Sequence, residues 1–297
     1  MPGHRLPRRA GPGGAVRAGC RRPSRNPTAL SIDTTDTGFG RAKKALGQHF
    51  LHERGIIDRI VHAIDPRPGQ RIVEIGPGQG ALTFPLLRAH GALTVIEFDR
   101  DLIAPLTAAA APLGELEIVH RDVLKVDFGE LAGSGGTLRL VGNLPYNISS
   151  PILFHALDHA DAIVDMHFML QKEVVDRMAA GPGSKVYGRL SVMLQAWCDV
   201  TPLFTVAPGA FRPPPKVDSA VVRLVPKART QVPIDDPLRF AAVVRAAFGQ
   251  RRKTLRNALG ALLDADAIAA AGIDPGQRAE QLEVADFIAL SKAPADA

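Results

Sequence analysis

The chain has 297 residues, of which 46% are apolar and 22% charged, a composition typical of an ordinary globular protein, and the length favours one large domain plus a small one. No apolar run is long enough to span a bilayer and no apolar signal-peptide core is present, which argues against a membrane or a secreted protein. Cys20 and Cys198 are the only cysteines, which argues against a disulfide-rich protein and a cysteine-zinc site and fits a reducing, cytoplasmic setting. The net charge of +6 comes from residues 1–32, whose seven arginines and lack of acidic residues leave the remaining chain near −1, so an overall basic surface is excluded and any nucleic-acid surface must come from local clustering.

The first segment, residues 1–38, is rich in Gly, Pro and Arg and has neither helical nor strand periodicity. Such a composition cannot bury enough apolar surface to offset the entropy of ordering, so it predicts a disordered basic tail. The tail is open to three interpretations: an arm that touches RNA, an artefact of an upstream start codon, or an organelle transit peptide. The last fits least, because prolines and glycines prevent an amphipathic helix.

An α/β pattern follows, in which each predicted strand is succeeded by a glycine turn or a polar side chain. The strand Arg71–Ile75 precedes the turn Gly76–Gly80 and a helix over 81–89; three further strands, Leu93–Ile96, Leu116–Val119 and Leu138–Gly142, are followed by Glu97, Asp122 and Asn143. Alternation of strands and helices predicts a parallel sheet with helices on both faces and ligands at the carboxyl ends of the strands.

The second half of the chain predicts the end of this domain and a smaller one. Ser191–Trp197 is typical of a buried helix or a helix–strand join, and Asp218–Val225 alternates as a strand does. A Pro-rich, basic linker over 226–233 leads into a helical, alanine-rich segment over 237–292. We therefore expect a large domain over residues 39–227 and a small helical RNA-binding domain over 228–297.

The glycine turn departs from the dinucleotide-binding pattern, because its third glycine follows the second by two positions instead of three. The tighter spacing resembles the glycine loop of methyltransferases that use S-adenosylmethionine, where no pyrophosphate is bound. Glu97, 21 residues after Gly76, is placed to accept hydrogen bonds from both ribose hydroxyls, and Asp122 to accept from the adenine amine of the cofactor.

The residues Asn143, Leu144, Pro145 and Tyr146 predict a site for a flat ring that bears an amine. The side-chain carbonyl of Asn143 and the backbone carbonyl of Leu144 can accept the two amine hydrogens, which lets the nitrogen pyramidalise and aim its lone pair at a methyl donor. Tyr146 can stack on one face of a base swung out of its helix, and Phe211 on the other. Each of the two aromatic rings has the alternative of lying in the core.

Basic residues gather at the start of a predicted helix in the small domain, at Arg251, Arg252, Lys253 and Arg256, and before the core at Arg41, Lys43 and Lys44. Phosphates are the simplest partner for such clusters, although a charge run can also be a solvated face. His49 and His52 lack a third ligand at metal spacing, so no metal site is expected.

Several blocks in order show a resemblance to the small-subunit rRNA adenine-N6,N6-dimethyltransferases, the KsgA/RsmA family. They are Leu46–Leu51, Val73–Gly80, Gly142–Ser149, Phe168–Val174, Phe211–Ala220 and Gln250–Asn257. The resemblance implies a Rossmann-like S-adenosylmethionine-dependent methyltransferase domain followed by a small helical domain. It further implies dimethylation of two adjacent adenines in the 3′-terminal hairpin of small-subunit rRNA, by a monomer acting on a pre-ribosomal 30S particle.

Carried over by position, the resemblance implies a set of cofactor contacts and a set of catalytic residues. The cofactor contacts fall on His49, Leu51, Gly76, Glu97, Asp122 and Asn143, and the catalytic loop on Asn143–Tyr146 with Phe211 opposite. His49 departs from the asparagine common in relatives, which leaves open whether it acts through its side chain or its backbone. The resemblance does not extend to the arginine-rich tail.

Three alternatives stay open at this point. A large-subunit rRNA adenine methyltransferase of the antibiotic-resistance type would share the fold and the loop, but the block Pro213–Ser219 and the basic helix argue against it. A DNA adenine methyltransferase usually begins the loop with Asp-Pro-Pro or Asn-Pro-Pro. A non-catalytic ribosome-assembly or transcription-associated factor would not need Glu97, Asp122, Asn143 and Tyr146 intact.

Overall fold

The computed structural model describes residues 48–250 and 252–294. The predicted tail of residues 1–38, the cations Arg41, Lys43 and Lys44, and Arg251 lie outside the described residues.

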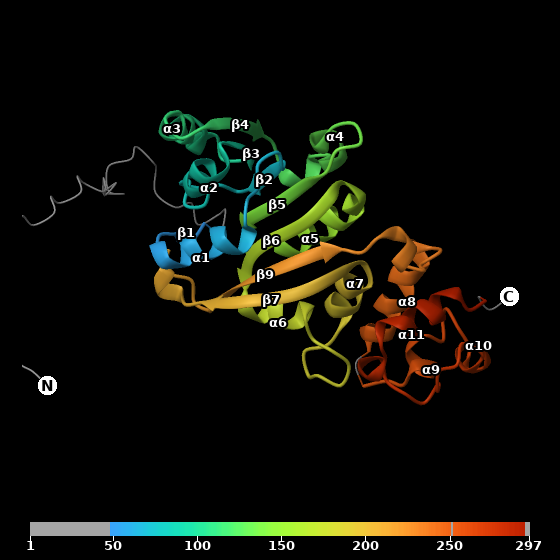
Figure 1. Ribbon diagram of the computed structural model, residues 1–297. Helices are drawn as coiled ribbons and strands as arrows, with labels where there is room; N and C mark the ends of the chain where they lie inside the picture. Colours follow the sequence, from blue (N-terminus) through green and yellow to red (C-terminus); the bar gives the residue numbers. More distant parts are fainter. Residues whose placement is uncertain (1–47, 251, 295–297) are drawn as a thin grey trace, which may run out of the picture. The chain divides into compact units, whose positions relative to one another are not determined.

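A seven-stranded sheet forms the centre of the described chain, in the order β4-β3-β2-β5-β6-β9-β7 (Figure 1). Neighbours from β4 to β6 pair in parallel, whereas β9 pairs antiparallel with both β6 and β7. Along the chain the strands are β2 (Ile72–Ile75), β3 (Ala92–Glu97), β4 (Glu115–His120), β5 (Leu138–Asn143), β6 (Ile163–Gln171), β7 (Cys198–Val206) and β9 (Ser219–Pro226).

The four strands predicted in the first half are confirmed as β2, β3, β4 and β5, each within one or two residues of the expected ends. The alternating strand predicted over Asp218–Val225 is confirmed as β9. For Ser191–Trp197 the helix alternative is confirmed, since the stretch lies within α7 (Arg189–Trp197), which passes directly into β7. The pattern predicted neither β6 nor β7. β6 carries a buried aspartate and a buried histidine, which break the run of apolar residues that marks a central strand.

Helices cover both faces of the sheet, and each face has its own apolar core. Isoleucines and leucines of α1 (Arg54–Ile64), α2 (Thr83–His90) and α3 (Arg100–Ala110) pack against one face. Side chains of α4 (Phe128–Ala132), α5 (Ser149–Asp158), α6 (Lys172–Met178) and α7 pack against the other. This two-sided layering is the doubly wound arrangement that the alternating pattern predicts.

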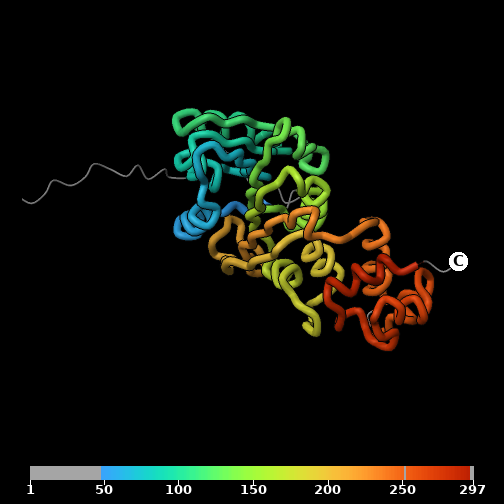
Figure 2. The backbone as a smooth tube through the Cα atoms, turned by 45° about the vertical axis from the view of Figure 1, so that its right-hand side comes forward, coloured from blue at the N-terminus to red at the C-terminus, as the bar shows by residue number. Residues whose placement is uncertain are grey.

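The C-terminal helices surround a third core. Its buried side chains come mainly from α8 (Pro237–Gly249), α9 (Leu255–Ala258), α10 (Ala265–Ala270) and α11 (Val284–Lys292). In Figure 2 these helices are the orange and red part of the tube. Helix α7 contributes Leu190 and Leu194 to the core under the sheet and Val192 and Ala196 to the third core. The division of the chain at residue 227 stays a prediction.

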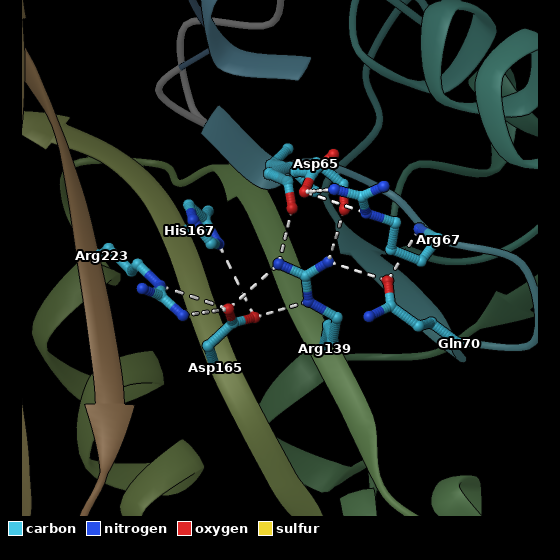
Figure 3. A network of polar contacts seen from close by, with 8 residues as sticks. Asp65, Arg67, Gln70, Arg139, Asp165, His167 and Arg223 are labelled. Carbon is cyan, nitrogen blue, oxygen red and sulfur yellow. Dashed lines mark hydrogen bonds and ion pairs between the residues drawn. The ribbon is translucent and has the colours of Figure 1, made fainter. Parts of the chain in front are cut away.

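A buried ion network fastens α1 to the sheet (Figure 3). Arg139 on β5 donates to both carboxylate oxygens of Asp165 on β6, at 2.7 and 3.0 Å, and to the last backbone carbonyl of α1, at Ile64, at 2.6 Å. Arg223 on β9 approaches the same carboxylate to 3.1 Å. Burial alone would raise the pKa of Asp165, but these two guanidinium groups, with His167 close by, hold it below its ordinary value.

A two-stranded sheet lies apart from the large one. It pairs β1 (Phe50–Leu51) with β8 (Phe211–Arg212), and the backbone N–H of His52 donates to Ala210 at 2.9 Å. Because β1 runs directly into the turn before α1, the ion network at the far end of α1 also helps to fix the position of β1.

Candidate active site

A cavity of about 330 Å³ opens at the carboxyl ends of β2, β3, β4 and β5, a size typical of small-molecule sites. Segment 48–51 lines it from the side of β1. The predicted cofactor and catalytic residues that line it are His49, Leu51, Gly76, Glu97, Asp122, Asn143, Leu144, Pro145 and Tyr146. One enclosure thus holds the predicted cofactor site and the predicted loop for the target base.

The glycine turn gives the cavity an open backbone wall. Gly76 has a φ of +66°, its N–H donates to Ile96 at 3.0 Å, and a Cβ atom built on it would meet no atom within 4 Å. Any side chain there would therefore project into open space that a ligand can use. Gly142 is needed for another reason: a Cβ atom there would lie 2.5 Å from the carbonyl oxygen of Ile75, so only glycine lets β5 approach the end of β2 so closely.

Two buried glutamates sit beneath this turn. Glu97 is 6% exposed, and its carboxylate accepts the N–H of Asp99 at 2.7 Å; burial raises its pKa, while backbone N–H groups, including that of Gly78, partly oppose the rise. Glu74 is 2% exposed, accepts only the Thr83 hydroxyl, at 2.7 Å, among the described residues, and has its pKa raised to about 8 by burial. Glu74 was not among the predicted site residues, because only its burial at the cavity wall gives it significance.

The charges around the cavity fit S-adenosylmethionine, which carries a sulfonium and an ammonium. Three carboxyl groups line it, those of Glu74, Glu97 and Asp122, against one guanidinium, that of Arg121. Even with Glu74 neutral near pH 7, as its raised pKa implies, the other two carboxyl groups outnumber the guanidinium and favour a cation over the pyrophosphate of a dinucleotide. Together with the open wall at Gly76, it provides the space and the electrostatic field for the cationic cofactor.

The amide of Asn143 has a defined orientation. Its Nδ2 lies 3.0 Å from the backbone carbonyl oxygen of His49, which can only accept, so the amide nitrogen must face that oxygen. Its Oδ1 therefore points elsewhere, and no described residue donates to it. Next to it, the N–H of Leu144 is bound to Met169 at 3.1 Å, and its carbonyl accepts no hydrogen bond from the described residues.

Tyr146 is half-buried and held on two sides. Its hydroxyl lies 2.7 Å from the hydroxyl of Ser219, and the ring of His49 stacks on it with centroids 5.6 Å apart and planes 27° apart. His49 is in turn held by a contact of 2.8 Å between its Nδ1 and the carbonyl oxygen of Pro213. Burial raises the pKa of Tyr146, and the bond to Ser219 opposes this only in part.

Phe211 does not lie in the cavity. It is 2% exposed and pairs with Leu51 across the small sheet. Its side chain packs in the apolar core that α1, α2 and α3 form with one face of the large sheet. The expectation that its ring covers the second face of a base is not met in this conformation, because the β1–β8 pairing turns the ring inward. The ring that does stack on Tyr146 is that of His49.

The remaining predicted residues lie at the surface. Arg252, Lys253 and Arg256 are exposed at the start of α9, and none forms an ion pair with a described residue. Within residues 48–250 and 252–294, no group of three or more His, Cys, Asp or Glu is arranged to hold a metal ion. In the same part of the chain, no helix has the length and apolar character that a membrane span requires.

Comparison with known proteins gives a consistent result. The family model of ribosomal RNA adenine dimethylases matches residues 40–296. A ribosomal RNA small subunit methyltransferase A from Xanthomonas campestris pv. campestris (strain B100) is 76% identical over 250 residues, covering 84% of this chain and 95% of that protein. The protein of the same name from Xanthomonas axonopodis pv. citri (strain 306) is equally similar, at 76% over 250 residues.

Among solved structures, a dimethyladenosine transferase from Plasmodium falciparum superposes with a TM-score of 0.72 at 27% identity, over 82% of this chain and 96% of that one. The 23S rRNA methyltransferase ErmE superposes with a TM-score of 0.63 at 24% identity, over 82% and 98%, a likeness that concerns the fold alone. These superpositions confirm the predicted Rossmann-like methyltransferase fold.

Proposed function

The chain belongs to the ribosomal RNA adenine dimethylase family, and on that premise we propose that it dimethylates the N6 amines of two adjacent adenines in the 3′-terminal hairpin of small-subunit rRNA. It is an enzyme, a methyltransferase whose cofactor is S-adenosylmethionine. We further propose that it acts as a monomer on a pre-ribosomal 30S particle in the cytoplasm and contributes to small-subunit biogenesis.

The observation that carries this proposal is the fixed amide of Asn143. Because Nδ2 is committed to the His49 carbonyl oxygen at 3.0 Å, Oδ1 is presented as an acceptor. The neighbouring carbonyl of Leu144 is a second acceptor at the same cavity wall. Two acceptors side by side match the two hydrogens of an exocyclic amine and would reject a keto oxygen at that position.

When bound, S-adenosylmethionine supplies a methyl group activated by a positively charged sulfur. The chain's own residues hold the adenine amine. Its hydrogens go to Asn143 Oδ1 and the Leu144 carbonyl, so its lone pair leaves the ring plane and is free to attack. Most of the rate then comes from position and alignment. No general base is required, because the methylated amine is acidic while it carries its extra proton.

For the other lining residues we propose the roles that the sequence suggests. Glu97 would accept hydrogen bonds from the ribose, and Asp122, at the end of β4, from the adenine of the cofactor. Leu51 would contact the cofactor through its apolar side chain, and Gly76 through its backbone. His49 contributes in two ways: its backbone carbonyl orients Asn143, and its ring contacts Tyr146.

For the RNA, we propose that Tyr146 stacks on the flipped adenine and that exposed cations hold the phosphates. Stacking of one base on an aromatic ring contributes about 1–3 kcal/mol, which offsets much of the cost of unstacking it. Arg252, Lys253 and Arg256 are exposed and unpaired with any described acidic group, so they would meet phosphates without first breaking an ion pair. Arg251 completes this predicted group.

Substitution of Asn143 by alanine tests the amine contact. Asn143→Ala should abolish methylation while preserving most of the affinity for RNA, since it removes one acceptor from the reacting group and none of the phosphate contacts. Methyl incorporation and RNA binding, measured on the same preparation, check this. Methylation at the wild-type rate would contradict the proposed amine activation.

The substrate is tested separately. Purified enzyme should methylate immature small-subunit particles, and mass spectrometry of small-subunit rRNA from cells that lack the protein should show dimethyladenosine missing. Modification of large-subunit RNA alone would favour a large-subunit enzyme instead. An enzyme that binds particles but transfers no methyl group to any RNA would favour an assembly factor.

A further inference from the structure

We propose that Ser219 is a positioning residue of the active site, whose hydroxyl fixes the ring of Tyr146 in the plane that the target base must adopt. This inference rests on the proposed function. Ser219 does not line the cavity and was not among the predicted site residues, so it would act through Tyr146 alone.

Ser219 is a rigid anchor. It is fully buried, with 0% exposure, and is the first residue of β9, where it pairs with Gln171 of β6 on one side and Val206 of β7 on the other. A serine between two strands of a sheet has little freedom to move. The partner that the structure gives its side-chain hydroxyl is the hydroxyl of Tyr146, 2.7 Å away and 73 residues earlier in the chain.

Tyr146, in contrast, stands on a loop. It follows Asn143, the last residue of β5, by three positions and precedes α5. Its ring therefore needs support from outside the loop, and two contacts supply it: Ser219 at the hydroxyl and the stacked ring of His49 on one face. With the tip and one face held, the ring cannot swing about the bonds that join it to the backbone.

A fixed ring plane matters for the chemistry because the stacked base shares it. If the ring tilts, the base tilts with it, and the exocyclic amine moves away from Asn143 Oδ1 and the Leu144 carbonyl. A displacement of about 1 Å at a reacting atom can lower the rate by about a hundredfold. Stacking alone needs no hydroxyl, so an anchoring bond to Ser219 explains why a tyrosine rather than a phenylalanine serves there.

The test is a double-mutant cycle on Ser219→Ala and Tyr146→Phe, with an assembled small-subunit particle as substrate. Each single change removes one end of the bond and keeps the rest of the side chain. We expect each to lower kcat by about tenfold or more while KM for the particle stays within about twofold, because phosphate contacts dominate binding. The double variant should be no slower than the slower single variant.

Ser191→Ala is the matched control. Ser191 is also 0% exposed and donates to a backbone carbonyl, that of Arg177, but lies on α7 away from the cavity. It should lose stability as Ser219→Ala does and keep its kcat. Binding of S-adenosylhomocysteine to all four variants shows that each is folded.

Two outcomes would overturn the proposal. One is a Ser219→Ala enzyme with wild-type kcat. The other is a double variant whose kcat falls below that of Tyr146→Phe by the same factor by which Ser219→Ala lowers the wild-type kcat, which would mean that the serine acts on a group other than Tyr146. Failure of the wild-type enzyme to methylate the particle would instead refute the proposed function, so the two failures are distinguishable.

Discussion

Two glutamates at the cavity, 23 residues apart in the chain, have similar burial and different surroundings. Several backbone N–H groups stabilise the charged form of Glu97, whereas the Thr83 hydroxyl is the single described donor to Glu74. Burial raises the pKa of Glu74 to about 8, and the one hydrogen bond from Thr83 opposes this only in part, so the side chain is neutral in the ligand-free protein near pH 7. A neutral acid beneath the glycine turn costs little to bury, and it can ionise when a cation enters.

This shift predicts a pH dependence of stability for Glu74→Gln. In the unfolded chain Glu74 titrates near 4.5, and in the folded protein near 8. Between these values unfolding releases a proton, so wild-type stability falls as the pH rises through the window, and the loss is complete above pH 8. Glutamine cannot titrate but keeps the bond from Thr83. Relative to wild type, the variant should gain on the order of a few kcal/mol between pH 5 and pH 8.

Urea unfolding of both proteins at intervals across that range measures the difference. Burial lowers the pKa of His167 from 6.5 to about 4, which makes stability depend on pH in the lower part of this range, but His167 is present in both proteins, so its effect cancels. A constant stability difference from pH 5 to pH 8 would contradict the assignment of a raised pKa to Glu74.

At the scale of elements, the Arg139–Asp165 network joins three parts of the fold. Arg139 belongs to β5, the strand that ends in Asn143, and it binds both the end of α1 and β6. The same arginine also donates to the side-chain oxygen of Gln70, 2.9 Å away (Figure 3). Since α1 follows β1 directly, the network fixes two walls of the cavity from the opposite end of the sheet.

Removal of one partner from this network should be costly. Arg139→Met would leave the Asp165 carboxylate buried at 2% exposure with Arg223 as its one strong partner and free the carbonyls at the end of α1. We expect a loss of about 3–5 kcal/mol in the free energy of unfolding.

Arg67→Met is the control, because Arg67 pairs with Asp65 at 2.6 Å with both side chains more than half exposed. Its loss should stay below about 1 kcal/mol. Equal losses for the two variants in urea denaturation would show that the buried network has no special role.

What the sequence revealed about these elements depended on how local the signal was. The strands that end at Ile75, Glu97 and Asn143 were predicted because apolar runs and the residues that close them are neighbours in sequence. β6 was missed because a buried Asp165 becomes acceptable in a central strand only when Arg139 and Arg223 donate to its carboxylate. Ser219 and Glu74 were missed for the same reason, since each depends on a partner or a cavity wall elsewhere. For Phe211 the sequence left two alternatives, the face of the base and the core, and only the pairing of β8 with β1 decides for the core in this conformation.

At the scale of the whole molecule, the exposed cations predicted to bind phosphates and the residues of the cavity lie in different parts of the chain. The charged side chains that line the cavity are mainly carboxylic acids, while the cations Arg252 and Lys253, unpaired among the described residues, lie at the start of α9. An RNA would therefore be attracted by the C-terminal helices and enter the cavity only through a neutral base.

Substitution of these cations should weaken binding and its dependence on salt together. The double variant Arg252→Gln/Lys253→Gln should bind particles less tightly, and the slope of log K against log salt should become shallower by about two, roughly one for each lost phosphate contact. Arg229→Gln, which removes an exposed arginine already paired with Asp161 at 3.1 Å, is the control. An unchanged slope in the double variant would place the phosphate contacts elsewhere.

Helix α7 gives this molecule a common wall between two apolar interiors. Leu190 and Leu194 face one interior, and Val192 and Ala196 the other. Removal of the C-terminal helices would therefore expose the apolar side chains Val192 and Ala196 of α7 to water. Both cores should accordingly unfold in a single calorimetric transition on heating. A truncated chain that ends before α8 should aggregate and lack methyltransferase activity.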